Sequence, residues 1–159
     1  MSISNLGRLI VSVGVAELAG VVGSIFTAAA IPAWYAGLAK PPLTPPNGVF
    51  APVWTTLYLL MGVALFIVWA GGARKPREQR QAFFVFALQL ALNVLWSLLF
   101  FGLENPGAGF IIIISLWLAI LATILAFHKL SRLAAYLLVP YILWVSFAIY
   151  LNYSIWALN

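Results

Sequence analysis

Residues 107–127 read GAGFIIIISLWLAILATILAF, a run with no charged side chain. An α-helix needs about 20 mostly apolar residues to cross the hydrocarbon core of a bilayer. Four further stretches meet this requirement, so that the predicted spans are residues 9–30, 49–70, 81–101, 107–127 and 133–156. The sequence therefore predicts an all-α integral membrane protein, a five-transmembrane-helix bundle that forms one domain over residues 1–159.

The composition of the whole chain supports the same assignment. Hydrophobic residues make up 65% of the 159 residues and charged residues 7%, with a mean hydropathy of +1.09. Soluble domains average about 45–50% apolar and about 25% charged residues. A chain this short leaves roughly a third of its surface exposed after folding. So much apolar surface is compatible with lipid as the solvent and not with water.

The rare residues exclude most catalytic and metal-binding chemistry. The chain has no cysteine and one histidine, His128, and its only acids are Glu17, Glu78 and Glu104. Thiolate and multi-histidine metal sites are therefore excluded. The predicted spans put the three glutamates at three different depths, which argues against a carboxylate pair or a Ser-His-acid triad. We expect no metal and no cofactor.

The distribution of basic residues predicts the orientation. All lysines and arginines except Lys40 fall on one side of the predicted membrane. Because Lys and Arg are enriched in cytoplasmic loops, the N-terminus is predicted to be cytoplasmic and the C-terminus external. The net charge of +5 is explained by this orientation, so no nucleic-acid partner is expected. The first span resembles a signal peptide, but it is longer than an h-region and contains Glu17.

The predicted external loop, residues 31–48, is rich in proline. Pro41, Pro42, Pro45 and Pro46 fix the backbone φ angle and disfavour helix and sheet. A stiff loop of this length favours a lid over a cavity, formed by Lys40, Pro41, Pro45 and Pro46. The alternative is a rigid tether, with Trp34 and Tyr35 in the interfacial aromatic belt.

The third span places polar and aromatic side chains on one helical face. Gln89, Asn93, Trp96 and Ser97 follow the i, i+4, i+7, i+8 spacing. Amides in lipid must find hydrogen-bond partners, so this face is predicted to point into the bundle. Interhelical hydrogen bonds and ligand contacts both fit this face.

Two other spans carry aromatic stripes. They comprise Trp54, Tyr58 and Met61 in the second span and Tyr141, Trp144, Ala148 and Asn152 in the fifth. Trp144 lies near mid-span, too deep for the interfacial belt, so its indole N–H needs a partner or a cavity. Trp54 lies near the outer end, where a belt position is the alternative to a cavity position.

The first and fourth spans differ in polarity. Glu17 falls near the centre of the first span, where an ionisable side chain is a functional-site hypothesis; a hydrogen-bonded carboxyl facing another helix is the alternative. Small residues such as Ala16 and Gly20 predict close helix packing on the same span, either inside the bundle or in a dimer. The fourth span is almost purely apolar, so it is predicted to face mainly lipid.

Three sequence blocks in order resemble the TspO/MBR family, which comprises microbial tryptophan-rich sensory proteins and the mitochondrial translocator protein. They are WYAGLAKPPLTPP at residues 34–46, QLALNVLWSLLFFG at 89–102 and VPYILWVSFAIYLNYSIW at 139–156. The resemblance implies a five-helix fold in a microbial plasma membrane, commonly a homodimer, with a cavity lidded by the external loop. It implies porphyrin ligands such as protoporphyrin IX, haem-related tetrapyrroles and other hydrophobic molecules.

The resemblance also implies a set of ligand-binding residues. The family's cavity positions correspond to Trp34, Tyr35, Trp54, Asn93, Trp96, Trp144 and Ala148, to which the aromatic stripes add Tyr58 and Tyr141. Some members degrade porphyrin in light, and tryptophans matched by Trp54 and Trp144 are implicated. A sterol motif of mitochondrial members needs a basic residue where this chain has Ala157, which argues against sterol binding there.

The leading hypothesis is thus a membrane receptor, sensor or transporter for tetrapyrroles. A light-dependent porphyrin-degrading enzyme is the alternative, and a structural bundle acting through protein partners is a third hypothesis. The residues supply stacking surfaces and amides but no acid–base pair for rapid turnover.

Overall fold

The computed structural model of the chain describes residues 3–71 and 75–159. Its described residues include five helical segments long and apolar enough to cross a membrane, as predicted. They are α1 (Ile3–Ala30) with the π-helical η1 (Ile31–Tyr35), α2 (Asn47–Gly71), α3 (Pro76–Ser97) with the π-helical η3 (Leu98–Gly102), α4 (Pro106–His128), and α5 (Arg132–Tyr136) with α6 (Val139–Leu158). Arg74, one of the basic residues that predict the orientation, lies outside the described residues.

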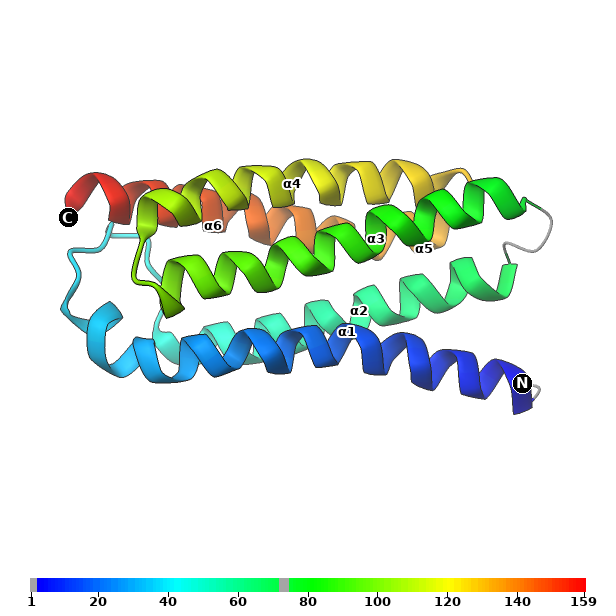
Figure 1. Cartoon of the computed structure of the whole chain (residues 1–159), viewed down its shortest axis with the longest axis horizontal. Coiled ribbons are helices and arrows are strands. Elements are labelled where there is room, and N and C mark those ends of the chain that lie inside the picture. Colours follow the sequence, from blue (N-terminus) through cyan, green and yellow to red (C-terminus); the bar gives the residue numbers. More distant parts are fainter. Residues whose placement is uncertain (1–2, 72–74) are drawn as a thin grey trace.

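The helices run side by side along the long axis of the molecule (Figure 1). α1 packs against α2 and α3, α3 against α4, and α4 against α6. The ring of Trp54 in α2 meets the ring of Tyr141 in α6, with centroids 6.2 Å apart, and this contact joins the two ends of the row.

The two ends of the bundle differ in charge. The start of α1, the start of α3 and the end of α4 lie together at what we call the basic end, which carries Arg8, Lys75, Arg77, Arg80, Lys129 and Arg132 (Figure 1). The segment after η1 and the C-terminus lie at the opposite end, which we call the loop end. The charge asymmetry read from the sequence is thus an asymmetry of the folded bundle.

Two helix boundaries differ from the prediction. The first helix does not stop near residue 30 but continues through Pro32 to Tyr35 as a π-helical turn. Pro32 removes one backbone N–H donor from the continuous helix, and the hydrogen-bond pattern changes from α-helical to π-helical at this position. Trp34 and Tyr35 therefore belong to a helix and not to the loop. The fifth span is split at residues 137–138, just before Pro140 in the first turn of α6.

Glycines set how closely α1 approaches its neighbours. A Cβ atom on Gly62 of α2 would lie 2.5 Å from the Cα atom of Val13 in α1. On Gly20 it would lie 2.6 Å from the ring of Tyr58. Side chains larger than hydrogen at these positions would force the helices apart. The small residues of α1 thus serve packing within the bundle, one of the two outcomes that their spacing allowed.

The fourth span was predicted to face mainly lipid, and it is buried to the same extent as α2 and the α5–α6 span, with 33% of its apolar stretch inside the bundle. α4 lies between α3 and α6 and buries residues such as Ile113, Leu116 and Ile120. Phe127 of α4 stacks on Phe86 of α3, with centroids 5.8 Å apart. The least buried span is the first, with 17% of its apolar stretch buried against 33% for the fourth. A uniformly apolar helix has no polar side chains that would distinguish its lipid-facing side from its buried side.

Candidate functional site

A cavity of about 300 Å³ lies between α1, α2 and α3 in the half of the bundle nearer the loop end. Its wall is formed by Glu17, Gly20, Val21, Gly23, Ser24, Thr27, Ile31 and Tyr35 of the first span, by Asn47, Phe50, Ala51, Trp54, Thr55 and Tyr58 of α2, and by Asn93, Trp96, Ser97 and Phe101 of the third. All three spans contribute both apolar and polar side chains. The volume is at the lower end of the range found for small-molecule sites, about 300–1,000 Å³.

The cavity begins where the close contact between α1 and α2 ends. Gly62 holds the two helices together toward the basic end. One turn further, the ring of Tyr58 rests on Gly20. Beyond that point the large ring of Trp54 lies on the wall. The change from glycine to aromatic residues along one face of α2 therefore opens the space.

Trp54 is the centre of the aromatic wall. Its ring centroid lies 5.7 Å from that of Tyr58, 6.1 Å from Trp96 and 6.2 Å from Tyr141. These distances and tilts are typical of favourable aromatic contacts. The contacts place Trp54 inside the bundle, so the interfacial-belt interpretation of this residue is not supported.

Asn93 connects the wall to the core by hydrogen bonds. The hydroxyl of Tyr58 donates to Asn93 Oδ1 at 2.6 Å, and Asn93 Nδ2 donates to the hydroxyl of Tyr141 at 2.8 Å. The Tyr141 hydroxyl in turn donates to Gln89 Oε1 at 2.9 Å. Three helices are thus joined through side chains that are almost fully buried. The polar face of the third span links helices and also lines a cavity, as both interpretations of it allowed.

Trp96 is fixed by a second set of hydrogen bonds. Its Nε1 donates to Asn152 Oδ1 at 3.0 Å, and Asn152 Nδ2 donates to the carbonyl of Pro106 at 2.7 Å. The indole ring therefore cannot rotate without breaking a contact with α6. A ring held in this way offers a preorganised stacking face to a ligand.

The α1 side of the cavity is polar. The hydroxyls of Ser24 and Thr27 donate to carbonyls of their own helix, those of Val21 and Ser24. Glu17 is the ionisable side chain of the wall. The sequence singled out Glu17 as a functional-site hypothesis but did not add it to the ligand-binding set. The helical spacing of Glu17, Ser24 and Thr27 is the signal that could have connected them.

Other wall residues were missed by sequence analysis. Phe50 precedes Trp54 by one turn of α2, so its spacing could have identified it. Phe101 lies in the π-helical η3, where the backbone departs from the α-helical repeat. No regular spacing from Asn93 and Trp96 therefore predicts its direction.

The structure separates the predicted ligand-binding residues into two layers. Tyr35, Trp54, Tyr58, Asn93 and Trp96 line the cavity, whereas Trp34, Tyr141, Trp144 and Ala148 are outside its wall. Trp144 contacts Phe50 with centroids 6.1 Å apart, and Trp34 meets Phe100 edge-on at 5.6 Å. Tyr141 and Ala148 are buried in α6. Trp144 and Tyr141 contact the wall from behind, Trp144 through Phe50 and Tyr141 through Trp54 and Asn93.

The predicted lid residues also lie outside the wall. The Lys40 ammonium donates to the carbonyls of Ala36 and Leu38 and lies 4.8 Å from the centre of the Tyr35 ring. Pro41, Pro45 and Pro46 follow in the same loop, whose two flanks, Tyr35 and Asn47, do reach the cavity.

The C-terminus holds this loop in place. Asn159 exchanges two hydrogen bonds of 3.0 Å with the backbone of Ala39. These contacts fix one position of the loop, while its function as a lid stays a prediction.

Comparison with known proteins gives consistent matches over nearly the whole chain. The family described as "TspO/MBR family" matches residues 12–157. The chain is 44% identical over 155 residues to "Tryptophan-rich protein TspO" of Archaeoglobus fulgidus, which covers 98% of this chain and 99% of that protein. It is 38% identical over 143 residues to "Translocator protein" of Bos taurus, covering 90% and 85% of the two chains. It is 37% identical over 126 residues to "Tryptophan-rich sensory protein" of Cereibacter sphaeroides, covering 79% and 77%.

Proposed function

This chain is a member of the TspO/MBR family of membrane proteins, and we propose that it is a membrane sensor or transporter that binds a tetrapyrrole such as protoporphyrin IX. The binding site is the cavity between α1, α2 and α3. The observation that carries the proposal is the wall of Tyr35, Trp54, Tyr58 and Trp96, which presents aromatic rings to one space.

The chemistry of the wall fits a flat and largely apolar ligand. Indole and phenol rings stack on an extended π-system, and the buried amide of Asn93 gives orientation through a polar edge. Ser24, Ala51 and Thr55 line the cavity and are exposed. The cavity is therefore open rather than sealed, so a ligand larger than its volume can extend out of it.

The orientation and assembly form part of the same proposal. The basic end faces the cytoplasm in a microbial plasma membrane, because basic residues are retained on that side. The loop end and the cavity then face outward, and the protein functions as a homodimer. Single cysteines at Lys40 and Gln81, in a chain without native cysteine, should react from outside and from inside, respectively. The reverse labelling pattern would contradict the orientation.

Titration of the purified protein with protoporphyrin IX in the dark tests the binding site. We expect Trp54→Phe to weaken binding by about 1–2 kcal/mol, the scale of one stacking or polar contact. Trp117→Phe is the matched control, since Trp117 donates to Ser146 at 2.8 Å between α4 and α6, away from the cavity. Equal effects of the two substitutions, or no saturable binding, would contradict the proposal.

Light-dependent porphyrin degradation is the second candidate function, and the aromatic contacts of Trp54 favour it. A ring in contact with Trp96 and two tyrosines can share a radical with its neighbours. Illumination of the complex with oxygen should then give more product than protein, and Trp54→Phe, Trp144→Phe should abolish it while still binding pigment. Recovery of intact pigment after light would leave binding as the function.

A further inference from the structure

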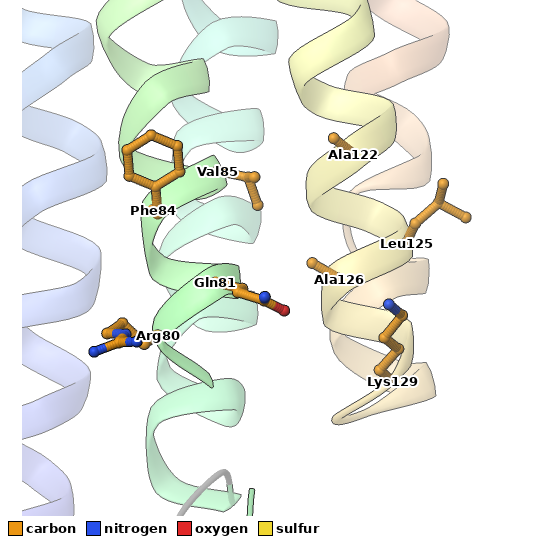
Figure 2. A pocket seen from close by; sticks show the side chains of 8 residues that line it. All are labelled: Arg80, Gln81, Phe84, Val85, Ala122, Leu125, Ala126 and Lys129. Carbon is orange, nitrogen blue, oxygen red and sulfur yellow. The ribbon is translucent and has the colours of Figure 1, made fainter. Parts of the chain in front are cut away.

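A second hollow lies on the outside of the bundle at the basic end, between α3 and α4. This groove has a volume of about 620 Å³, and Arg80, Gln81 and Phe84 of α3 line it together with Ala122, Leu125 and Lys129 of α4 (Figure 2). It is separate from the tetrapyrrole cavity, since the two share no lining residue.

The groove has a polar end and an apolar floor. Gln81 points from α3 toward α4, Lys129 lies at the end of α4, and Arg80 extends from the other side of α3 (Figure 2). Above them, toward the middle of the bundle, Val85 faces Ala122 and Ala126 across the gap. The groove extends about 10 Å along the axis of α4, from Lys129 to Ala122.

The apolar part of the groove is uncovered. The side chain of Phe84 is 70% exposed, the largest value among the exposed large hydrophobic residues of the described chain. Ala122 and Ala126 are small, so they leave room for a chain beside α4. A phospholipid carries apolar acyl chains on a polar headgroup. A narrow apolar channel that ends in cations therefore matches an anionic phospholipid in shape and in the position of its charge.

The cations at this end lack acidic partners in the described part of the chain. Glu78 is the acid of the basic end, and its carboxylate pairs with Lys75 at 3.3 Å. The other two glutamates are Glu17 in the cavity wall and Glu104 at the loop end. Arg80 and Lys129 are exposed and are therefore available to a negative charge from outside the protein.

We propose that the groove binds one anionic phospholipid from the leaflet at the basic end. Its phosphate lies at Lys129 and Gln81, and Arg80, which points to the other side of α3 in Figure 2, adds a second cation when its long side chain turns toward the groove. An acyl chain lies along Phe84, Val85 and the two alanines. Basic pockets between transmembrane helices are suited to anionic headgroups, at about 1 kcal/mol for each Lys or Arg near the surface.

Charge favours lipid over a second copy of the chain on this face. In a two-fold dimer with both chains in the same membrane orientation, identical residues meet at the same depth. Arg80 and Lys129 of one copy would then lie close to the same two cations of the other copy, with no carboxylate between them. A lipid phosphate satisfies the same cations without this repulsion.

Native mass spectrometry of the detergent-purified protein provides the test. The probes are dioleoyl phosphatidylglycerol and dioleoyl phosphatidylcholine, which share acyl chains and differ in net charge. We expect the protein to retain one phosphatidylglycerol per chain in preference to phosphatidylcholine. Arg80→Gln, Lys129→Gln should weaken this binding by about fivefold for each cation removed.

A second double variant removes the same charge elsewhere at the basic end. Arg77→Gln, Arg132→Gln removes two exposed cations that do not line the groove, and it should keep the preference for phosphatidylglycerol. Equal weakening by both double variants would mean diffuse attraction and would overturn the site. Unchanged lipid binding with an altered monomer–dimer ratio in Arg80→Gln, Lys129→Gln would make the face an interface between copies.

Inorganic phosphate separates lipid from a free anion. An excess of phosphate at constant ionic strength should leave phosphatidylglycerol bound, because the apolar floor contributes to lipid binding and not to phosphate binding. Phe84→Ala should weaken phosphatidylglycerol binding with both cations in place. Full displacement by phosphate, together with no effect of Phe84→Ala, would overturn the lipid proposal.

Discussion

The α1–α2 pair is built differently in its two halves. Toward the basic end, Gly62 brings the backbones into contact, with room for no side chain between them. Toward the loop end, Tyr58 and Trp54 occupy the equivalent face of α2 and the helices enclose a cavity. In lipid, where apolar burial gives little drive for association, such packing contacts determine where helices meet. The half toward the basic end therefore stabilises the helix pair, and the half toward the loop end leaves space for a ligand.

The comparison predicts its largest effect at Gly62. Gly62→Leu places a branched side chain where even a Cβ atom is 2.5 Å from the backbone of Val13, so the helices must separate. We expect a loss of about 3 kcal/mol in the free energy of unfolding, at the upper end of overpacking effects. Thermal or denaturant unfolding in detergent measures it.

Gly14→Leu is the matched control for this substitution. A Cβ atom on Gly14 meets nothing within 4 Å, and the gain in helix propensity from glycine to leucine is the same at both positions. The control should be as stable as the parent or more stable. Similar losses in both variants would mean that the close approach of α1 and α2 does not carry the stability of this half.

The next effect is expected at Asn93 of α3, which is hydrogen-bonded to Tyr58 at the boundary between the two halves. Asn93→Leu removes the acceptor of the Tyr58 hydroxyl and the donor to Tyr141. Interhelical hydrogen bonds in membranes average about 0.6 kcal/mol and reach about 1.7 kcal/mol, so we expect a loss of about 1.5 kcal/mol from the two. Ser115→Ala, which removes a bond within one helix, should cost less than 0.5 kcal/mol by the same scale.

The sequence predicted much of this arrangement because polarity is a strong signal in lipid. Gln89, Asn93 and Asn152 could be placed inside the bundle, since exposed amides are costly there. Their partners were less predictable. Tyr58 and Tyr141 were expected to contact ligand, yet Tyr141 instead bridges Asn93 and Gln89 behind the wall. Spacing along one helix gives a face but not the identity of the helix opposite.

Apolar and irregular segments were the least predictable. The burial of α4 depends on shape matching with α3 and α6, and its sequence carries no polar mark. Trp34 and Tyr35 were assigned to the loop because the first span was predicted to end at residue 30, but the π-helical turn extends the helix by five residues. Trp144 was placed at the cavity by its depth and by the family resemblance, whereas in the structure its ring contacts Phe50, a residue of the wall.

A smaller effect, on binding rather than stability, is expected at Gly20. Gly20→Ala places a methyl group 2.6 Å from the Tyr58 ring, so the ring must move and its hydrogen bond to Asn93 is strained. We expect porphyrin binding to weaken by about 1 kcal/mol, the scale of one hydrogen bond. Gly14→Ala is the control, and fluorescence titration measures both. Unchanged affinity would show that the position of Tyr58 does not shape the site.

The smallest effect is expected at Glu17, where it reports which part of a ligand lies on the α1 side. Protoporphyrin carries two propionates, and a carboxylate in the same cavity disfavours them by like-charge repulsion. Glu17→Gln replaces an acceptor by an amide that can also donate, so it should strengthen protoporphyrin binding by about threefold, or ~0.6 kcal/mol. The dimethyl ester of protoporphyrin lacks both charges and should bind the parent and the variant equally. A gain of the same size for the ester would assign the effect to shape and not to charge. Weaker binding of the free acid alone would instead mean that Glu17 shares a proton with a propionate, which places the polar edge of the ligand against α1 as an acid pair.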